Sequence, residues 1–242
     1  MGKIYVIGIG PGNESDMTIR AAQTIKSCDI IVGYKVYTDL VRKVFPDKEY
    51  YESGMRQELA RCEKCVEFAR LGKTVALICS GDAGVYGMAS PLLDIADKED
   101  FDDVEIVPGV TAALSGAAIL GAPLSHDFCT ISLSDLLTPR ELIEKRLLNA
   151  AEGDFCIALY NPASHGRPDH LKWACEILMT VLSGDTACGY VRNIGRDGTE
   201  KNICLLKELS DIKADMLMTV FVGNSLTRIS EGRLITPRGY LM

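Results

Sequence analysis

The sequence has no uninterrupted apolar run of about 18 residues, the length that a membrane-spanning helix needs. Its first residues, Met1-Gly-Lys-Ile, lead directly into an apolar run, so we expect no signal peptide. It also lacks an excess of basic residues, because the formal net charge is −7. An acidic chain of this kind is not typical of nucleic-acid-binding proteins. We therefore expect neither a membrane nor a nucleic acid as a partner.

The sequence also lacks a recognisable metal-binding cluster, although it contains nine cysteines. Only Cys62 and Cys65 form a close pair, and no second pair follows at the spacing of a zinc site. Cys62 shares a helical spacing with Val66 and Ala69, so we interpret the pair as small buried residues of a helix. Free cysteines in a chain of this length fit a reducing compartment. We predict a cytoplasmic protein without a bound metal.

Neither of the two common phosphate-binding glycine motifs is present. The loop Gly8-Ile9-Gly10-Pro11-Gly12-Asn13 follows an expected strand at Lys3–Ile9, but Asn13 stands where a dinucleotide fingerprint needs its third glycine. No Lys-Ser or Lys-Thr pair follows that would make a P-loop. We expect Ser15-Asp16 to cap a helix from about residue 17 to 27. The loop itself is better suited to holding a ligand through backbone atoms.

What the sequence does contain is a short apolar strand, Val75–Cys79, that ends in the small-residue loop Ser80-Gly-Asp-Ala-Gly84. Open α/β sheets bind ligands at the carboxyl ends of their strands. Asp82 adds a negative charge, which argues against phosphate and favours a ligand with hydroxyls or an amine. A third such loop, Pro108-Gly-Val-Thr-Ala112, follows an expected strand at 104–107. If the three strands are neighbours, the three loops converge on one site.

Alternating strand and helix patterns in the first half indicate βαβ units and a mainly parallel sheet. We expect a strand at 30–32 and helices at 37–45, 56–71, 86–97 and 113–121. Ala122-Pro123-Leu124 has the composition of a hinge. The chain is therefore predicted to be an α/β protein of two domains, residues 1–122 and 123–242.

The second domain is expected to contain a mixed sheet. Strands are predicted at 130–133, 154–160, 186–191, 202–206 and 216–222, the last two joined by a polar link typical of antiparallel pairing. One helix should begin at a capping box from Thr138 to Glu141, and another should cover about 168–182.

The glycine motifs at 6–13, 80–87 and 108–112, in this order and spacing, together resemble those of the tetrapyrrole methylases. The stretches 131–147, 158–162 and 235–240 are similar to the branch that methylates C17 of precorrin-3B or cobalt-factor III. The resemblance implies two αβα domains with a cleft between them and S-adenosylmethionine as the cofactor. It further implies methyl transfer to C17 coupled to ring contraction in cobalamin biosynthesis, and a homodimer.

The resemblance also assigns roles to residues. The expected cofactor contacts are Ile9, Gly10, Pro11, Gly81, Asp82, Val85, Thr111, Ala112, Tyr160, Asn161 and Asn193. Arginine pairs well with carboxylates, so the expected partners of the macrocycle's carboxylates are Arg140, Arg192, Arg196 and Arg238. Ring contraction needs a proton donor or acceptor, for which the candidates are His126, Asp127, Ser132 and Asp135. His165 and His170 are expected to face solvent.

Three alternatives stay open from the sequence. A sister methylase could act at another carbon of the macrocycle, or the chain could be a tetrapyrrole- or nucleotide-binding module without catalysis. The third alternative is the diphthine or ribosomal-RNA branch of the fold, although the Ser-Leu-Ser-Asp stretch at 132–135 and the acidic charge argue against RNA. Whether the substrate carries cobalt or no metal is not decided by these motifs.

Overall fold

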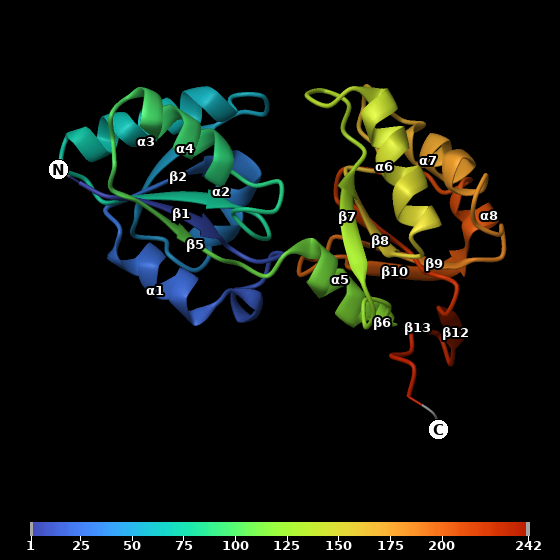
Figure 1. Cartoon of the computed structure of the whole chain (residues 1–242). Coiled ribbons are helices and arrows are strands. Elements are labelled where there is room, and N and C mark those ends of the chain that lie inside the picture. The colour runs from blue at the N-terminus through green and yellow to red at the C-terminus, as the bar shows by residue number, and fades with distance from the viewer. Residues whose placement is uncertain (1, 241–242) are drawn as a thin grey trace. The chain divides into compact units, whose positions relative to one another are not determined.

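The structure, a computed structural model, describes residues 2–240 and divides into two compact units. One unit ends at Ala112 and the other begins at Ala113 (Figure 1). The division lies earlier than the predicted one after residue 122, because helix α5 (Ala112–Leu120) packs into the second unit. A Cβ placed on Gly116 of α5 would lie 2.8 Å from the ring of Phe221.

The first unit is built on a five-stranded sheet in the order β3-β2-β4-β1-β5, and neighbouring strands pair in parallel. The strands are β1 (Ile4–Gly8), β2 (Ile30–Tyr34), β3 (Glu49–Ser53), β4 (Val75–Cys79) and β5 (Val104–Val107). The predicted parallel α/β architecture is confirmed. The sequence prediction missed β3, an edge strand whose residues are half-buried or exposed.

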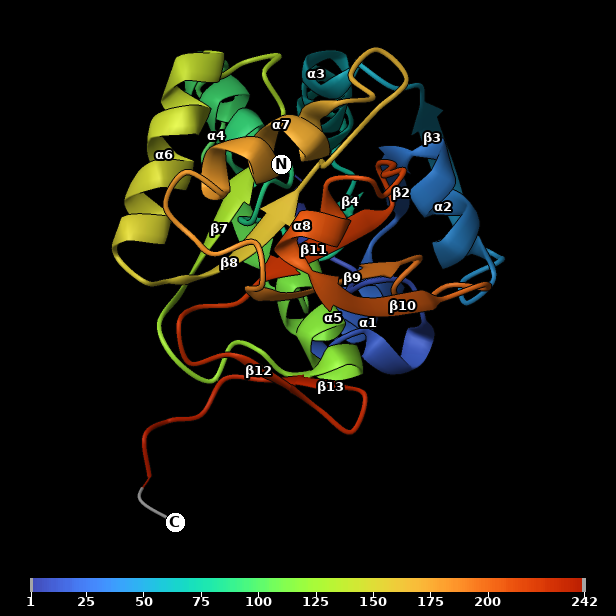
Figure 2. The ribbon, with the colours of Figure 1, turned by 90° about the vertical axis from the view of Figure 1, so that its right-hand side faces the viewer.

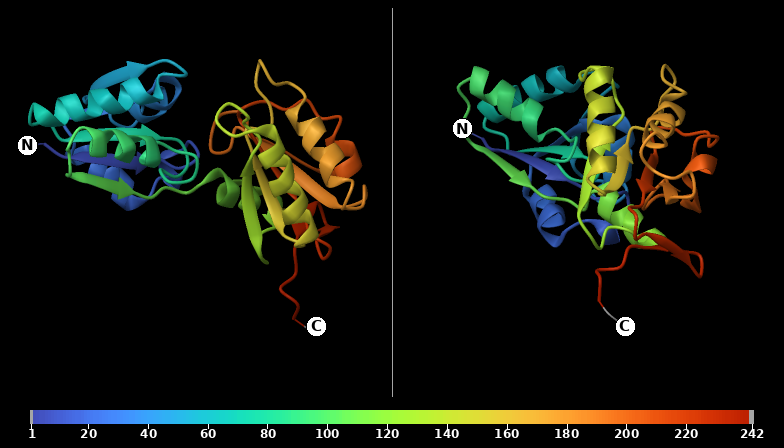
Figure 3. Two further views of the ribbon diagram at one scale, coloured as in Figure 1. Left: turned by 45° about the horizontal axis from the view of Figure 1, so that its top comes forward. Right: turned by 45° about the vertical axis from the view of Figure 1, so that its right-hand side comes forward.

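Helices cover both faces of this sheet, as the left panel of Figure 3 shows. Helices α1 (Ile19–Ser27) and α2 (Lys35–Arg42) pack against Ile7 and Ile31. Helices α3 (Glu58–Arg70) and α4 (Ala89–Lys98) pack against Val6 and Val32 on the opposite face. Side chains alternate between the faces of a strand, so a central strand flanked by helices must be apolar at nearly every position.

The predicted cap of α1 is wrong. Thr18, not Ser15 or Asp16, precedes the helix, and its Oγ1 accepts a hydrogen bond from the amide of Ala21 at 3.0 Å. Glu14–Asp16 instead form a short 3-10 turn.

The second unit contains a mixed five-stranded sheet in the order β10-β9-β11-β8-β7. Its strands are β7 (Phe128–Ser132), β8 (Cys156–Tyr160), β9 (Ala187–Arg192), β10 (Glu200–Leu205) and β11 (Met218–Val222). Only β7 and β8 pair in parallel within this sheet. The expected pairing of the last two strands is wrong, because β9 lies between β10 and β11.

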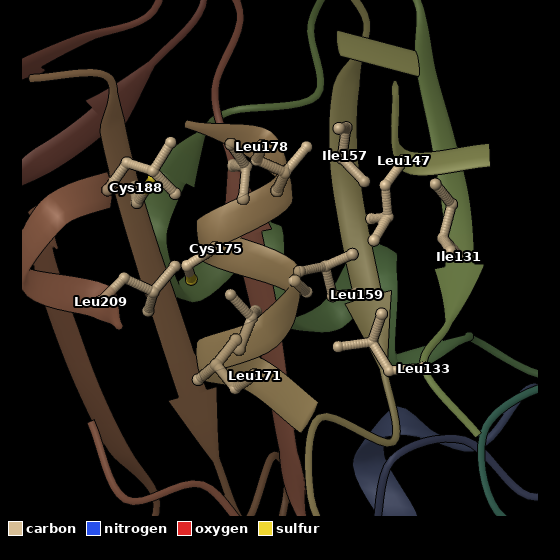
Figure 4. Packing of buried hydrophobic residues seen from close by; sticks show 14 of the residues in the cluster. Ile131, Leu133, Leu147, Ile157, Leu159, Leu171, Cys175, Leu178, Cys188 and Leu209 are labelled. Atoms are coloured by element: carbon tan, nitrogen blue, oxygen red, sulfur yellow. The ribbon is translucent and has the colours of Figure 1, made fainter. Parts of the chain in front are cut away.

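One face of this sheet is covered by α6 (Arg140–Glu152), α7 (His170–Leu178) and α8 (Leu206–Leu209). Helices α6 and α7 also pack against each other, as seen in Figure 2. Figure 4 shows Leu171, Cys175 and Leu178 of α7 among the buried apolar side chains of this core. The predicted capping box at the start of α6 is wrong, because Pro139 occupies the cap position and supplies no side-chain hydrogen bond.

A small third sheet joins the predicted hinge to the end of the chain. Strand β6 (Gly121–Ala122) pairs in parallel with β13 (Arg233–Ile235), which pairs in turn with β12 (Arg228–Ser230). The amide of Thr236 donates to the Ala122 carbonyl at 3.1 Å, and its hydroxyl donates to the Pro123 carbonyl at 2.7 Å. Ala122 is therefore held in a sheet and the Pro123 carbonyl by the Thr236 side chain, so the predicted hinge at 122–124 lies within the second unit and not at the division between the units. No helix between residues 2 and 240 has the length and apolarity to cross a membrane.

Candidate functional site

Strand β1 lies between β4 and β5, so the three glycine loops emerge side by side at the carboxyl edge of the first sheet. The amide of Gly10 donates to the Gly81 carbonyl at 3.0 Å, and the amide of Gly81 donates back to the Gly10 carbonyl at 2.7 Å. Both residues have positive φ, 73° and 70°, a conformation that favours glycine. The predicted convergence of the loops is confirmed.

Asp82 joins two of these loops through its carboxylate. Its Oδ1 accepts hydrogen bonds from the amides of Gly84 at 2.8 Å and Val85 at 3.1 Å. Its Oδ2 accepts a hydrogen bond from the amide of Gly109 at 3.0 Å. The side chain therefore orders the loop after β4 and fastens it to the loop after β5, in addition to any contact with a ligand.

The glycines allow the backbones to approach closely. A Cβ on Gly109 would lie 2.2 Å from the Gly81 carbonyl oxygen and 2.5 Å from that of Gly8. A Cβ on Gly81 would lie 3.6 Å from the Cα of Thr111 and 3.7 Å from the nitrogen of Ala112. The structure thus brings the eight predicted cofactor contacts of the first unit to one edge. Ile9 is only 2 % exposed, so its side chain belongs to the core.

The chemistry of these loops fits S-adenosylmethionine better than a phosphate ligand. The stretches 8–13, 80–87 and 108–112 contain no lysine or arginine and one carboxylate, that of Asp82. A ligand with a sulfonium and an ammonium group gains from a negative neighbour, and its hydroxyl and carboxylate groups can pair with backbone atoms. A phosphate would meet no positive side chain from these stretches.

In the second unit, β11 runs antiparallel to both β8 and β9, so β7, β8 and β9 end at the same edge of the sheet. Asn161 and Asn193 follow β8 and β9 and have positive φ values of 52° and 54°. The Asn161 side-chain amide donates to Ser132 Oγ at 2.9 Å. The hydroxyl of Tyr160 accepts a hydrogen bond from the Ala113 amide at the start of α5, at 2.8 Å.

The four predicted acid–base residues do not form one group. His126 and Asp127 precede β7, whereas Ser132 and Asp135 lie at or beyond its carboxyl end. A strand rises about 3.3 Å per residue, so β7 separates the two pairs by roughly 16 Å. The His126 and Asp127 side chains are 43 % and 85 % exposed, and their 3.8 Å contact is loose. Of these four residues, Ser132 is the one whose contact with Asn161 is direct.

Two residues near Asp135 were missed or misplaced by the sequence reading. His170, expected to face solvent, is buried, and its Nε2 lies 2.9 Å from Asp135 Oδ2. Arg167 donates to Ser134 Oγ at 2.7 Å and lies 3.5 Å from Asp135 Oδ1. One feature of the sequence could have indicated that His170 is buried, because it stands at the start of a helix whose apolar residues recur at helical spacing. Its exposed neighbour His165 follows the prediction.

The four predicted substrate arginines have different surroundings. The guanidinium of Arg140 lies 4.2 Å from the ring centre of Trp173. Arg192 is paired with Glu200 and Asp215, each at 2.8 Å, so its charge is already compensated. The Arg196 amide donates to the Asn193 carbonyl at 2.9 Å. Arg238 is exposed near the end of the described chain.

All nine cysteines are free thiols, and eight of them are buried. Burial raises the pKa of the Cys62 thiol to about 12 and places the pKa of Cys65 well above its usual value. No group of three metal-binding side chains occurs within residues 2–240. The interpretation of Cys62 and Cys65 as buried packing residues is confirmed.

Comparison with known proteins is consistent with these features. Residues 3–210 match the family described as tetrapyrrole (corrin/porphyrin) methylases. The chain belongs to this family. A relative from Salmonella typhimurium, named a probable cobalt-factor III C(17)-methyltransferase, is 47% identical over 99% of this chain and 100% of its own length. The precorrin-3B C(17)-methyltransferase of a Sinorhizobium species is 40% identical over 99% of this chain and 97% of its own.

A solved structure of the methyltransferase CobJ superimposes with a TM-score of 0.90 at 36% sequence identity, covering 98% of this chain and 100% of that chain. Membership of the tetrapyrrole methylases confirms the predicted enzyme class, an S-adenosylmethionine-dependent methyltransferase. The alternative of a binding module without catalysis is not supported.

Proposed function

We propose that this tetrapyrrole methylase transfers a methyl group to C17 of cobalt-factor III or precorrin-3B and contracts the macrocycle in cobalamin biosynthesis. The proposal is carried by the 47% identity to the Salmonella relative, which extends over the whole of that protein.

The donor would be held by backbone atoms of the three glycine loops, with Asp82 fixing their arrangement. When bound, S-adenosylmethionine supplies an electrophilic methyl group on a sulfonium. The protein's part in that step is to hold the two reactants in line, an effect that can contribute about 7–11 kcal/mol. Methyl transfer from a sulfonium needs little proton transfer, so the acid–base groups are assigned to ring contraction.

Among the proposed substrate arginines, Arg140 and Arg238 are exposed and suited to bind the carboxylates of the macrocycle. Arg192 would bind a carboxylate only by giving up its contact with Glu200 or Asp215. Arg192 is therefore the weakest of the four candidates.

The chain is further proposed to form a cytoplasmic homodimer. Strand β7 is an edge strand, and Phe128, Leu142 and Phe155 near it are 40 %, 40 % and 38 % exposed. An edge strand with exposed apolar neighbours favours pairing with another chain. We propose that this partner is a second copy of the same chain. Sedimentation of the wild-type protein and of Phe128→Glu would test this. A wild-type monomer at micromolar concentration would contradict it.

Anaerobic incubation of the purified protein with S-adenosylmethionine and cobalt-factor III, followed by mass spectrometry, tests the reaction. We expect the macrocycle to gain one methyl group and to show the spectrum of a contracted ring. Turnover of metal-free precorrin-3B alone would assign the chain to that substrate. No product from either, with the donor still bound, would identify a sister methylase that acts at another carbon.

A further inference from the structure

A continuous set of polar contacts lies at the carboxyl ends of β7 and β8. Asp135 is at its centre, with His170 Nε2 2.9 Å from one carboxylate oxygen and Arg167 Nη1 3.5 Å from the other. The side chains of His170 and Arg167 are 9 % and 17 % exposed, whereas that of Asp135 is 28 % exposed. Two largely buried groups therefore hold a carboxylate that still reaches solvent.

The contacts continue to a predicted cofactor residue. Arg167 donates to Ser134 Oγ at 2.7 Å, and the Ser134 amide donates to Ser132 Oγ at 3.3 Å. Ser132 Oγ also accepts the hydrogen bond from the Asn161 side chain at 2.9 Å. These contacts therefore connect Asp135 with Asn161, a residue at which the donor is proposed to bind.

The charges around Asp135 favour its ionised form. The hydrogen bond with His170 is the main cause that lowers the pKa of Asp135, with a smaller contribution from the charge of Arg167. Arg140 of α6 is stacked on Trp173, whose ring centre is 6.0 Å from that of His170. An ionised carboxylate accepts protons and hydrogen bonds but cannot donate them.

The surface beside this carboxylate is apolar. Leu136 and Leu137, the next two residues, are 59 % and 98 % exposed. Exposed leucines beside a fixed charge match a ligand that combines a large apolar ring with a polar group.

We propose that Asp135, held in place by His170 and Arg167, is the proton acceptor for ring contraction. This inference rests on the proposed function. On a substrate that carries a hydroxyl on the ring carbon to be extruded, Asp135 takes the proton of that hydroxyl, the electron pair of the broken O–H bond stays on the oxygen, and Asp135 later releases the proton to water. His170 and Arg167 are positioning residues. His126 and Asp127, at the other end of β7, have no part in this step.

Steady-state kinetics on four variants tests the assignment, with donor binding by calorimetry and thermal unfolding measured beside it. Asp135→Asn should lower kcat about 10²–10⁴-fold, the range of a lost general base, while the Kd of S-adenosylhomocysteine changes less than twofold. His170→Phe should lower kcat about tenfold and move the acid limb of the pH profile to higher pH. His170→Gln should restore most of the activity, because its amide can donate to Asp135 as Nε2 does.

His165→Gln is the matched control, since His165 is an exposed histidine of the loop that leads to α7. Its kcat and pH profile should equal those of the wild type. Wild-type kcat in Asp135→Asn would overturn the assignment, as would a His170→Phe protein that is less stable but keeps its kcat and pH profile. A wild-type protein inactive on both substrates would instead overturn the proposed function.

Discussion

The carboxylate of Asp82 accepts a hydrogen bond from the backbone amide of Gly109 at 3.0 Å, so one side chain joins the loops that follow β4 and β5. The same carboxylate also accepts from Gly84 and Val85. A carboxylate has about four acceptor positions, and three of them are used within the protein. The main role of Asp82 is therefore to shape the cofactor loops, and a direct contact with an ammonium or hydroxyl would be secondary.

Replacement of Asp82 by alanine should weaken both the loops and the binding of the donor. Three backbone amides lose a charged acceptor, and each such hydrogen bond contributes about 1.5–3 kcal/mol at most. Because the position is half-buried, water replaces part of what is lost, and the free energy of unfolding should fall by about 2–4 kcal/mol in total. We expect the Kd of S-adenosylhomocysteine to rise at least tenfold by calorimetry. Asp94→Ala, which removes an exposed carboxylate of α4, is the control. An unchanged Kd in Asp82→Ala would contradict this role.

A single methyl group on Gly109 should disrupt the same edge of the sheet. The added Cβ would lie 2.2 Å from the Gly81 carbonyl oxygen, a backbone atom that cannot turn away. Overpacking of this kind costs about 3 kcal/mol or more, so the melting temperature of Gly109→Ala should fall by roughly 6–12 °C. Gly166→Ala, with no atom within 4 Å of the new Cβ, should melt as the wild type does. Equal melting temperatures for the two variants would show that the loops can separate freely.

The sequence predicts local structure well where pattern and burial agree. Val75–Cys79 and Val104–Val107 are strands at the predicted residues. Val75–Cys79 is buried throughout and ends in glycine, and a buried parallel strand reads as a continuous apolar run. Glu49–Ser53 carries no such signal, because it is an edge strand with charged and half-buried side chains.

The site was harder to predict because it depends on contacts between distant residues. His126 stands close to Ser132 in the sequence, but an extended strand places its two ends at opposite edges of the sheet. His170 is 35 residues from Asp135, and its polar neighbours in the sequence favoured an exposed position. The glycine loops were predictable as a group, whereas the three hydrogen bonds of Asp82 were not.

The contact between Asp135 and His170 predicts a specific loss of stability in acid. The pKa of Asp135 is lowered in the folded protein, chiefly by the hydrogen bond with His170. A carboxylate with a lowered pKa stabilises the fold above its ordinary pKa of about 3.9, and this contribution is lost as the pH falls through the folded value. The partial exposure of Asp135 limits the effect to about 1 kcal/mol.

Urea unfolding of wild type and Asp135→Asn from pH 7 to pH 2 measures this contribution. The wild type should be the more stable protein above about pH 4, and the difference in free energy of unfolding should vanish in stronger acid. Asp94→Asn controls for the loss of a surface carboxylate. A difference that is constant over the whole range would show that the charge of Asp135 does not contribute.

The cysteines should be unreactive in the folded protein. Burial raises the pKa of Cys79 and of the half-buried Cys129 to about 11, and that of Cys175 to about 12. The thiolate is the reactive form, and a thiol with a pKa near 11 is ionised at pH 8 to roughly one part in a thousand. Ellman's reagent should therefore label the native protein slowly, Cys129 first, and all nine thiols in denaturant. Cys129→Ala should remove the first phase of labelling. Fast labelling of several thiols without denaturant would contradict the interpretation of the cysteines as buried packing residues.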